Sequence, residues 1–125
     1  PILIDALDRI RDSYNVNGLA QAAAIAALSD RNYYRKLFER IKNTRTCTTV
    51  ELESLGCDVI QSQTNFVFAK PPLLTAKDWF HALRNKKILT RWFDAPHIRE
   101  YLRITIGSQS DMAKFADATR RIFRP

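Results

Sequence analysis

The stretch TNFVFAKPPLLTAKDWFHALRNKKILTRWF, residues 64–93, decides the fold because its hydrophobic period changes twice. Its first part alternates as a strand does, with Phe66 and Phe68 on one face and Val67 and Ala69 on the other. We expect both phenylalanines to belong to the core. Two consecutive prolines then end the strand.

The middle of this stretch predicts a helix. Thr75 with Asp78 resembles a capping box, and Leu74 with Trp79 occupies the two positions of a hydrophobic staple. Together they favour a helix over residues 76–84.

Two further strands are expected downstream, over residues 88–93 and 101–106. A second capping pair, Ser108 with Asp111, predicts a closing helix that runs to Phe123. Short returns between consecutive strands favour antiparallel pairing.

Upstream, one long helix is expected from a cap at Ser29 or Asp30 to a stop at Gly56. Its middle, TRTCTT at residues 44–49, has low helix propensity, so we expect a kink or a break there.

Two helices are expected before the long one. The first dozen residues carry an apolar stripe, and the Ala-rich residues 19–28 are nearly uncharged. A break is expected between them, from Tyr14 to Gly18. The predicted class is therefore α/β of the α+β type: a mainly antiparallel sheet of three to four strands, with helices packed on one face and N-terminal helices before it.

Composition limits the classes of protein. The 125 residues are 46% hydrophobic and suit one folded domain. The net charge of +7 favours phosphate, nucleic acid, an anionic membrane surface or a carboxylate as partner, although a solvated basic surface explains it equally well. Cys47 and Cys57 fit neither a redox pair nor a zinc spacing, and we expect reduced, buried thiols. Without an apolar run of membrane-spanning length or a signal peptide, we expect a cytoplasmic protein. A start at Pro1 instead of Met suggests a processed product or a piece of a longer chain.

Two arginines are the strongest candidates for a binding site. In YLRITIG, Arg103 alternates with apolar neighbours and should point away from the core, and Arg91 repeats the pattern in ILTRWF. If both lie on one side, they form a two-pronged anion site. The alternative is a surface Arg103 that pairs with Glu100 or Asp94.

No catalytic constellation is visible. The sequence contains no P-loop, GxGxxG, GxSxG or HExxH motif, no paired carboxylates and no metal-ligand spacing. Because Phe66 and Phe68 are expected in the core, no aromatic platform for single-stranded nucleic acid is expected either.

Four segments in order, SYNVNGLAQAAAIAAL, LGCDVIQSQTNFVFAK, ILTRWF and YLRITIG, resemble the C-terminal part of histidinol-phosphate aminotransferases, which are fold-type I pyridoxal-phosphate enzymes. The resemblance covers essentially the whole chain. It implies that residues 1–30 are helices on the inter-domain or large-domain side and that residues 31–125 form the C-terminal small domain.

The resemblance also implies roles for three residues. Arg103 matches the arginine that binds the substrate's α-carboxylate, and Arg91 matches the arginine at the phosphate end of the substrate. Thr90 stands where the family usually has valine. Asn65 matches a position at the inter-domain cleft and is a weaker candidate.

The family's Schiff-base lysine and the aspartate that pairs with the pyridine nitrogen have no counterparts in this sequence. The resemblance therefore implies pyridoxal phosphate in the intact enzyme but none bound to this chain, which should be inactive alone. The implied partners are the rest of the enzyme, histidinol phosphate with glutamate or 2-oxoglutarate, and a second subunit in a homodimer.

Three alternatives stay open. A related enzyme of the same fold, such as a threonine-phosphate decarboxylase or an aromatic aminotransferase, would share these motifs. A basic module that binds nucleic acid or a regulatory anion would explain the charge. A piece without function of its own would expose residues 19–28 and self-associate.

Overall fold

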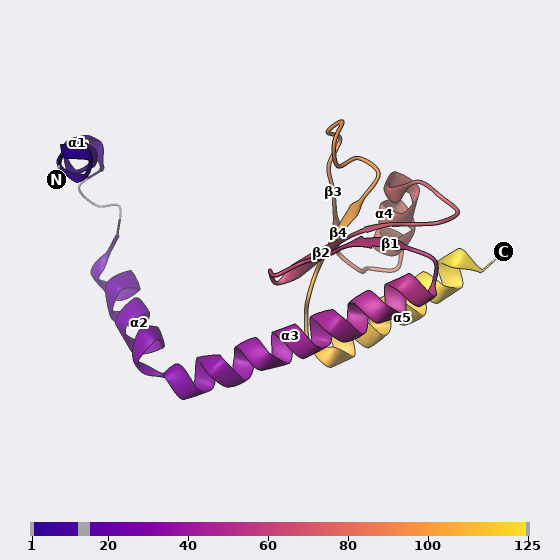
Figure 1. Ribbon diagram of the computed structural model, residues 1–125, viewed down its shortest axis with the longest axis horizontal. Coiled ribbons are helices and arrows are strands. Elements are labelled where there is room, and N and C mark those ends of the chain that lie inside the picture. Colours follow the sequence, from indigo (N-terminus) through magenta and orange to yellow (C-terminus); the bar gives the residue numbers. More distant parts are fainter. Residues whose placement is uncertain (1, 13–15, 125) are drawn as a thin grey trace. The chain divides into compact units, whose positions relative to one another are not determined.

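The computed structural model describes residues 2–12 and 16–124 (Figure 1). The chain divides into two compact units, Pro1–Leu37 and Phe38–Pro125. The division lies inside one helix, α3 (Arg31–Ser54), seven residues after the boundary expected from the sequence. The assignment of residues 1–30 to the large-domain side stays a prediction.

The first unit contains α1 (Ile2–Ile10), α2 (Gly18–Ser29) and the start of α3. Asn17 caps α2, since its side chain accepts a hydrogen bond from the Ala20 backbone N–H at 2.8 Å. The sequence predicts a break from Tyr14 to Gly18. Residues 14 and 15 of this segment lie outside the described residues, and so does residue 13 before it. No residue of α1 or α2 is buried.

Self-association of the 125-residue chain is the expected result of this exposure. Leu19 and Leu28 on α2 are 82% and 76% exposed, and burying such side chains against a second copy is favourable. Sedimentation velocity at several concentrations should therefore show a rising weight-average mass. Leu19→Lys with Leu28→Lys should reduce the rise, and a monomer at every concentration would contradict the prediction.

The expected break in α3 is wrong, because the helix runs unbroken from Arg31 to Ser54. Within its weak middle, the hydroxyls of Thr46 and Thr48 donate to backbone carbonyls one turn earlier, at 3.1 and 2.8 Å. These bonds satisfy the groups that otherwise compete with a helix. Gly56, with φ of 85°, ends the helix as expected.

The sheet has four antiparallel strands in the order β1-β2-β4-β3, which confirms the predicted class. The strands are β1 (Asp58–Ile60), β2 (Phe66–Lys70), β3 (Arg91–Trp92) and β4 (Leu102–Thr105). The third strand is shorter than the predicted residues 88–93. Ile88, the first residue of the predicted strand, instead belongs to the end of the preceding helix, because its N–H donates to the Leu83 carbonyl at 3.0 Å.

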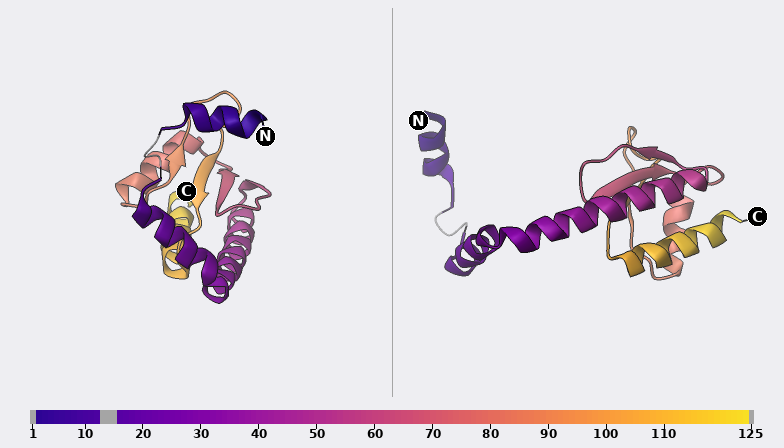
Figure 2. Two further views of the ribbon diagram at one scale, coloured as in Figure 1. Left: turned by 90° about the vertical axis from the view of Figure 1, so that its left-hand side faces the viewer. Right: turned by 60° about the horizontal axis from the view of Figure 1, so that its bottom comes forward.

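Helices α4 (Ala76–Asn85) and α5 (Gln109–Phe123) pack with the C-terminal half of α3 on one face of the sheet (Figure 2). Thr75 caps α4, and Ser108 forms a full capping box with Asp111 at the start of α5, both as predicted. The core contains apolar residues from all three helices and the sheet; the largest fully buried ones are Trp79, Leu52, Leu83, Leu102 and Val67.

The two cysteines differ in burial. Both are free thiols. Cys57 is buried as expected, and desolvation raises its pKa to about 12, so it stays protonated. The expectation for Cys47 is wrong, because this residue lies on the exposed side of α3.

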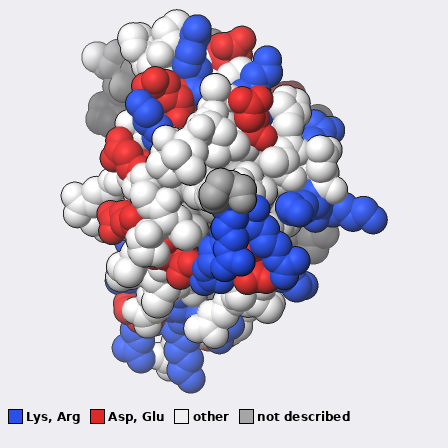
Figure 3. Space-filling model, turned by 90° about the vertical axis from the view of Figure 1, so that its right-hand side faces the viewer, with Lys and Arg blue, Asp and Glu red and all other residues white. Residues whose placement is uncertain are grey.

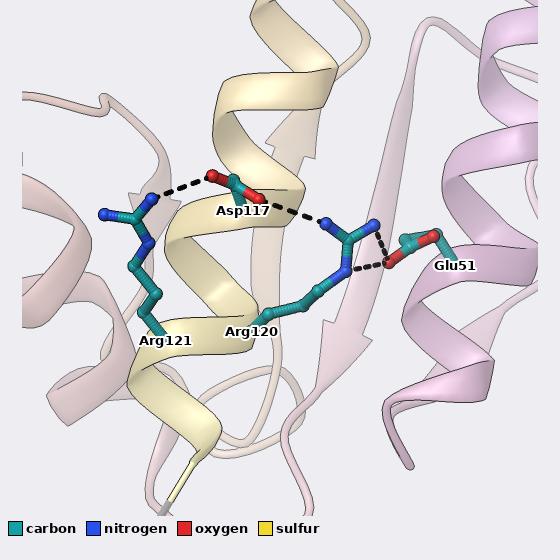
Figure 4. A network of polar contacts seen from close by, with 4 residues as sticks. All are labelled: Glu51, Asp117, Arg120 and Arg121. Atoms are coloured by element: carbon teal, nitrogen blue, oxygen red, sulfur yellow. Dashed lines mark hydrogen bonds and ion pairs between the residues drawn. The ribbon is translucent and has the colours of Figure 1, made fainter.

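A network of ion pairs joins α3 to α5 (Figure 4). The Arg120 guanidinium contacts Glu51 Oε1 through Nε at 2.8 Å and Nη2 at 2.7 Å. Asp117 bridges Arg120 and Arg121 at 3.2 and 3.1 Å. Because these side chains are partly exposed, we expect the network to contribute to helix register more than to stability.

Thr119→Val is expected to stabilise the protein by about 1 kcal/mol. Thr119 is fully buried in α5, and its hydroxyl has no hydrogen-bond partner among the described residues. Valine keeps the branched shape and removes the unsatisfied group. Urea unfolding should show a higher midpoint at an unchanged slope. The matched control is Thr48→Val, which removes a hydroxyl that does donate and should not stabilise; a loss of stability in Thr119→Val would contradict the prediction.

Candidate functional site

The pairing of β3 with β4 places the two candidate arginines side by side. Arg91 and Arg103 are direct cross-strand partners. Directly opposite residues in an antiparallel pair point to the same face of the sheet. The neighbours of Arg103 in β4, Leu102 and Ile104, are 0% and 2% exposed and face the helices. Both arginines therefore lie on the open face.

The same register continues across the sheet. Ile60 pairs with Phe68, Phe68 pairs with Arg103, and Arg103 pairs with Arg91. One row of side chains thus crosses the four strands and changes from apolar to basic. An anion with an apolar body can lie along such a row and place its charge at the β4–β3 end.

The prediction that Phe66 and Phe68 belong to the core is wrong. They lie on the open face, half-buried, and their rings form an edge-to-face pair with centroids 5.7 Å apart. The side chains of β2 alternate between two faces as predicted, but the helices cover the face of Val67 and Ala69. The two faces of this strand are similarly apolar, so only the packing decides which one is buried.

The rings support the arginines. The Arg103 guanidinium lies over Phe66 at 4.8 Å from the centroid, and Arg91 lies over Phe93 at the same distance. A ring face attracts a cation and keeps water from one side of it. Each ring therefore helps to hold its guanidinium in place, and neither guanidinium forms an ion pair among the described residues. These supporting rings were missed because the sequence does not give the register.

Arg103 has an unsatisfied donor. Its Nε is buried and has no hydrogen-bond partner among the described residues. The alternative pairing with Glu100 or Asp94 is wrong, because Glu100 pairs with Lys70 at 3.1 Å and Asp94 lies 3.9 Å from Arg99. A buried donor without a partner costs free energy, and two adjacent cations repel each other. A bound carboxylate or phosphate would relieve both.

At the C-terminal end of β2, the charged side chains already have partners. Glu100 accepts a hydrogen bond from Lys70 and raises the pKa of that lysine. Tyr101 donates to Asp58 Oδ2 at 3.2 Å, and this bond raises the pKa of the tyrosine hydroxyl. An arriving anion therefore has its charged partners at the arginine pair and not at this end of the face.

Asn65 lies just before β2 and is exposed. Its backbone carbonyl accepts a hydrogen bond from the Ile106 N–H at 2.8 Å, which extends the pairing of β2 with β4. The structure thus places Asn65 at the end of this ladder, and a role of its side chain in the site stays a prediction.

Other kinds of site receive no support. Within residues 2–12 and 16–124, no three His, Cys, Asp or Glu side chains cluster closely enough to hold a metal ion. None of the helices in this part of the chain combines the length and apolar character that a membrane crossing requires.

Comparison with known proteins places the chain in a family. A model of the family "Aminotransferase class I and II" matches residues 1–119. Histidinol-phosphate aminotransferase of Citrifermentans bemidjiense is 45% identical over 122 residues, which are 98% of this chain and 35% of the relative. The enzyme of the same name from Synechocystis is 43% identical over 112 residues, 90% of this chain and 32% of the relative. The chain spans about a third of the length of these curated relatives.

Two solved structures also match most of the chain. Histidinol-phosphate aminotransferase from Sinorhizobium meliloti, solved in complex with pyridoxal-5'-phosphate, has a TM-score of 0.81 at 26% identity and matches 95% of this chain and 33% of its own. The enzyme of that name from Clostridium acetobutylicum has a TM-score of 0.84 at 23% identity, over 94% of this chain and 36% of its own, and shows the fold. The chain therefore belongs to the class I and II aminotransferases.

Proposed function

We propose that the chain is the C-terminal third of a pyridoxal-phosphate-dependent aminotransferase that exchanges an amino group between L-histidinol phosphate and 2-oxoglutarate. The likeness to enzymes named for histidinol phosphate supports the substrate. The observation that carries the proposal is the cross-strand pair of Arg91 and Arg103 on an open, ring-lined face.

In this proposal, each of the two arginines binds a different substrate. Arg103 binds the carboxylate of glutamate or 2-oxoglutarate, because its fork is fixed by Phe66 and its Nε lacks a partner. Arg91, which is more exposed and at the edge strand, favours the phosphate of histidinol phosphate. Asn65 contributes at the end of the same face.

We infer that the arginine pair binds the substrates and that the cofactor is held by another part of the intact enzyme. Pyridoxal phosphate supplies an electron sink when bound and needs a lysine whose amine is readily deprotonated. Lys70 is on the open strand β2, but Glu100 raises its pKa and keeps it protonated. We therefore assign the lysine and the cofactor to polypeptide beyond residues 1–125, and infer that the chain alone binds no cofactor and is inactive.

The proposed assembly follows from the exposed helices. The apolar side chains of α1 and α2 suit the remaining domain of the same enzyme, and we infer a homodimeric, cytoplasmic enzyme with reduced cysteines. Figure 3 shows acidic side chains among the basic ones on one face, together with one cluster of Lys and Arg near its centre. We infer that nucleic acid is not a partner. The ring of Phe66 is also covered by Arg103 and is not free to stack on a base.

A chimera tests the proposed activity. The 122-residue match of this chain would replace the corresponding segment of the Citrifermentans bemidjiense enzyme, to which it is 45% identical. We expect the chimera to form glutamate from histidinol phosphate and 2-oxoglutarate, whereas the 125-residue chain alone forms none.

The substrate profile of the chimera decides between related functions. Preference for an aromatic amino acid, or carbon dioxide release from threonine phosphate, would replace the proposed substrate with that of a related enzyme. A correctly folded chimera that turns over none of these compounds would contradict the proposal.

A further inference from the structure

A hollow of about 340 Å³ lies between the α4–β3 connection, the end of β4 and the first half of α5. Its floor is apolar, since Ile104, Met112 and Phe115 line it and are all buried. Ile104 faces the helices whereas Arg103 faces the open side, so this hollow is separate from the arginine pair. Its volume is in the range of small-molecule sites.

The rim contains a lysine in a costly backbone conformation. Lys87 has φ of 60°, the left-handed region that favours glycine. It stands directly after the C-cap of α4, where its N–H donates to the Arg84 carbonyl at 2.9 Å and the next N–H donates to Leu83. Glycine is usual at this position of a helix end. A lysine there lowers stability, and residues held in such conformations gather at binding sites.

The rim also contains donors without acceptors. Thr90 Oγ1 is buried and has no hydrogen-bond partner among the described residues. Neither Lys87 nor Lys114 lies within ion-pair distance of a carboxylate in residues 2–12 and 16–124, although Lys114 is close enough to Asp111 to contribute to the lowering of its pKa. The carboxylate at the rim, Asp111, is already bound by the N–H and hydroxyl of Ser108, at 3.1 and 2.6 Å. Two lysines, the Asp111 carboxylate and one buried hydroxyl therefore line a hollow with an apolar floor, and the formal charges of its lining sum to +1.

We propose that this hollow binds the phosphate monoester of a small apolar molecule. A phosphate offers three acceptor oxygens and is mostly a dianion at neutral pH, which suits the two lysines and the net positive charge of the lining. The apolar part of the ligand covers Ile104 and Phe115. The site does not depend on the proposed transamination, because it shares no residue with the arginine pair.

Binding is tested on the 125-residue chain with phenyl phosphate as the probe. In a titration followed by amide NMR, we expect saturable shifts at Thr90, Gly107 and Lys114. Inorganic phosphate, which lacks the apolar part, and phenol, which lacks the charge, should each bind at least tenfold more weakly. Shifts confined to the strands around Arg91 and Arg103, or equal binding of inorganic phosphate, would overturn the proposal.

Variants separate binding from folding. Lys87→Gly should weaken phenyl phosphate about tenfold, the loss of one charge-assisted contact, without lowering the urea midpoint. A purely structural role would not weaken binding while sparing stability. Lys114→Gln should weaken the probe by a similar factor. Lys86→Gln is the matched control, since Lys86 precedes Lys87 and does not line the hollow; unchanged affinity in Lys87→Gly would contradict the assignment.

Discussion

Trp79→Ala should lower the free energy of unfolding by about 3–5 kcal/mol, the usual cost of removing a large buried aromatic side chain. Trp79 is fully buried, and its ring lies 6.0 Å from that of Phe115 and 5.1 Å from that of Phe123. It joins α4 to α5, two of the helices that cover the sheet. The loss is reduced slightly because the Trp79 Nε1 is a buried donor without a partner in the described part of the chain.

Urea unfolding followed by circular dichroism at 222 nm measures this loss. Trp79→Phe keeps a ring and removes the unpaired N–H, so it should cost much less and remain measurable if Trp79→Ala does not fold. Leu89→Ala is the surface control, because Leu89 is 85% exposed and its truncation should change stability by less than about 0.5 kcal/mol. Equal losses in Trp79→Ala and Leu89→Ala would show that this ring does not anchor the helices.

Local signals in the sequence predicted the elements well where each depends on neighbouring residues. The cap at Thr75, the capping box at Ser108 and the stop at Gly56 are all present, because each is a bond or a backbone conformation made within a few positions. The expected break in α3 failed for a related reason. Low propensity is a weak effect, and the hydroxyl of Thr48 finds an acceptor inside the helix.

Properties that depend on distant residues were harder to predict. The alternating pattern of β2 predicts which side chains share a face. It does not predict that the helices cover the face of Val67 and leave the face of Phe66 uncovered. The sequence likewise placed Arg91 and Arg103 on strands, whereas their pairing depends on the register of β3 against β4. The candidate arginines were thus found from sequence, and the rings that hold them were found only in the structure.

Arg103→Leu in the chimera should lower kcat/KM for glutamate by about two to three orders of magnitude. The leucine keeps an apolar stem over Phe66 and removes the charged fork. Truncating one partner of a buried charge-assisted pair commonly costs about 2–5 kcal/mol, and the expected loss of two to three orders of magnitude corresponds to about 3–4 kcal/mol, within that range. Arg103→Lys keeps the charge but loses the second, parallel hydrogen bond, so it should lose about tenfold to a hundredfold.

Substitution of each arginine should impair the reaction of a different substrate. This difference separates a role in binding from a defect in folding. Arg91→Gln should raise KM for histidinol phosphate and leave the half-reaction with glutamate nearly unchanged, whereas Arg103→Lys should do the reverse. Single-turnover measurements of each half-reaction provide the comparison. Arg99→Gln is the control, since the Arg99 side chain is exposed and its ion pair with Asp94 is long, at 3.9 Å. Equal losses on both substrates in both variants would mean that the arginines maintain the sheet and do not divide the substrates.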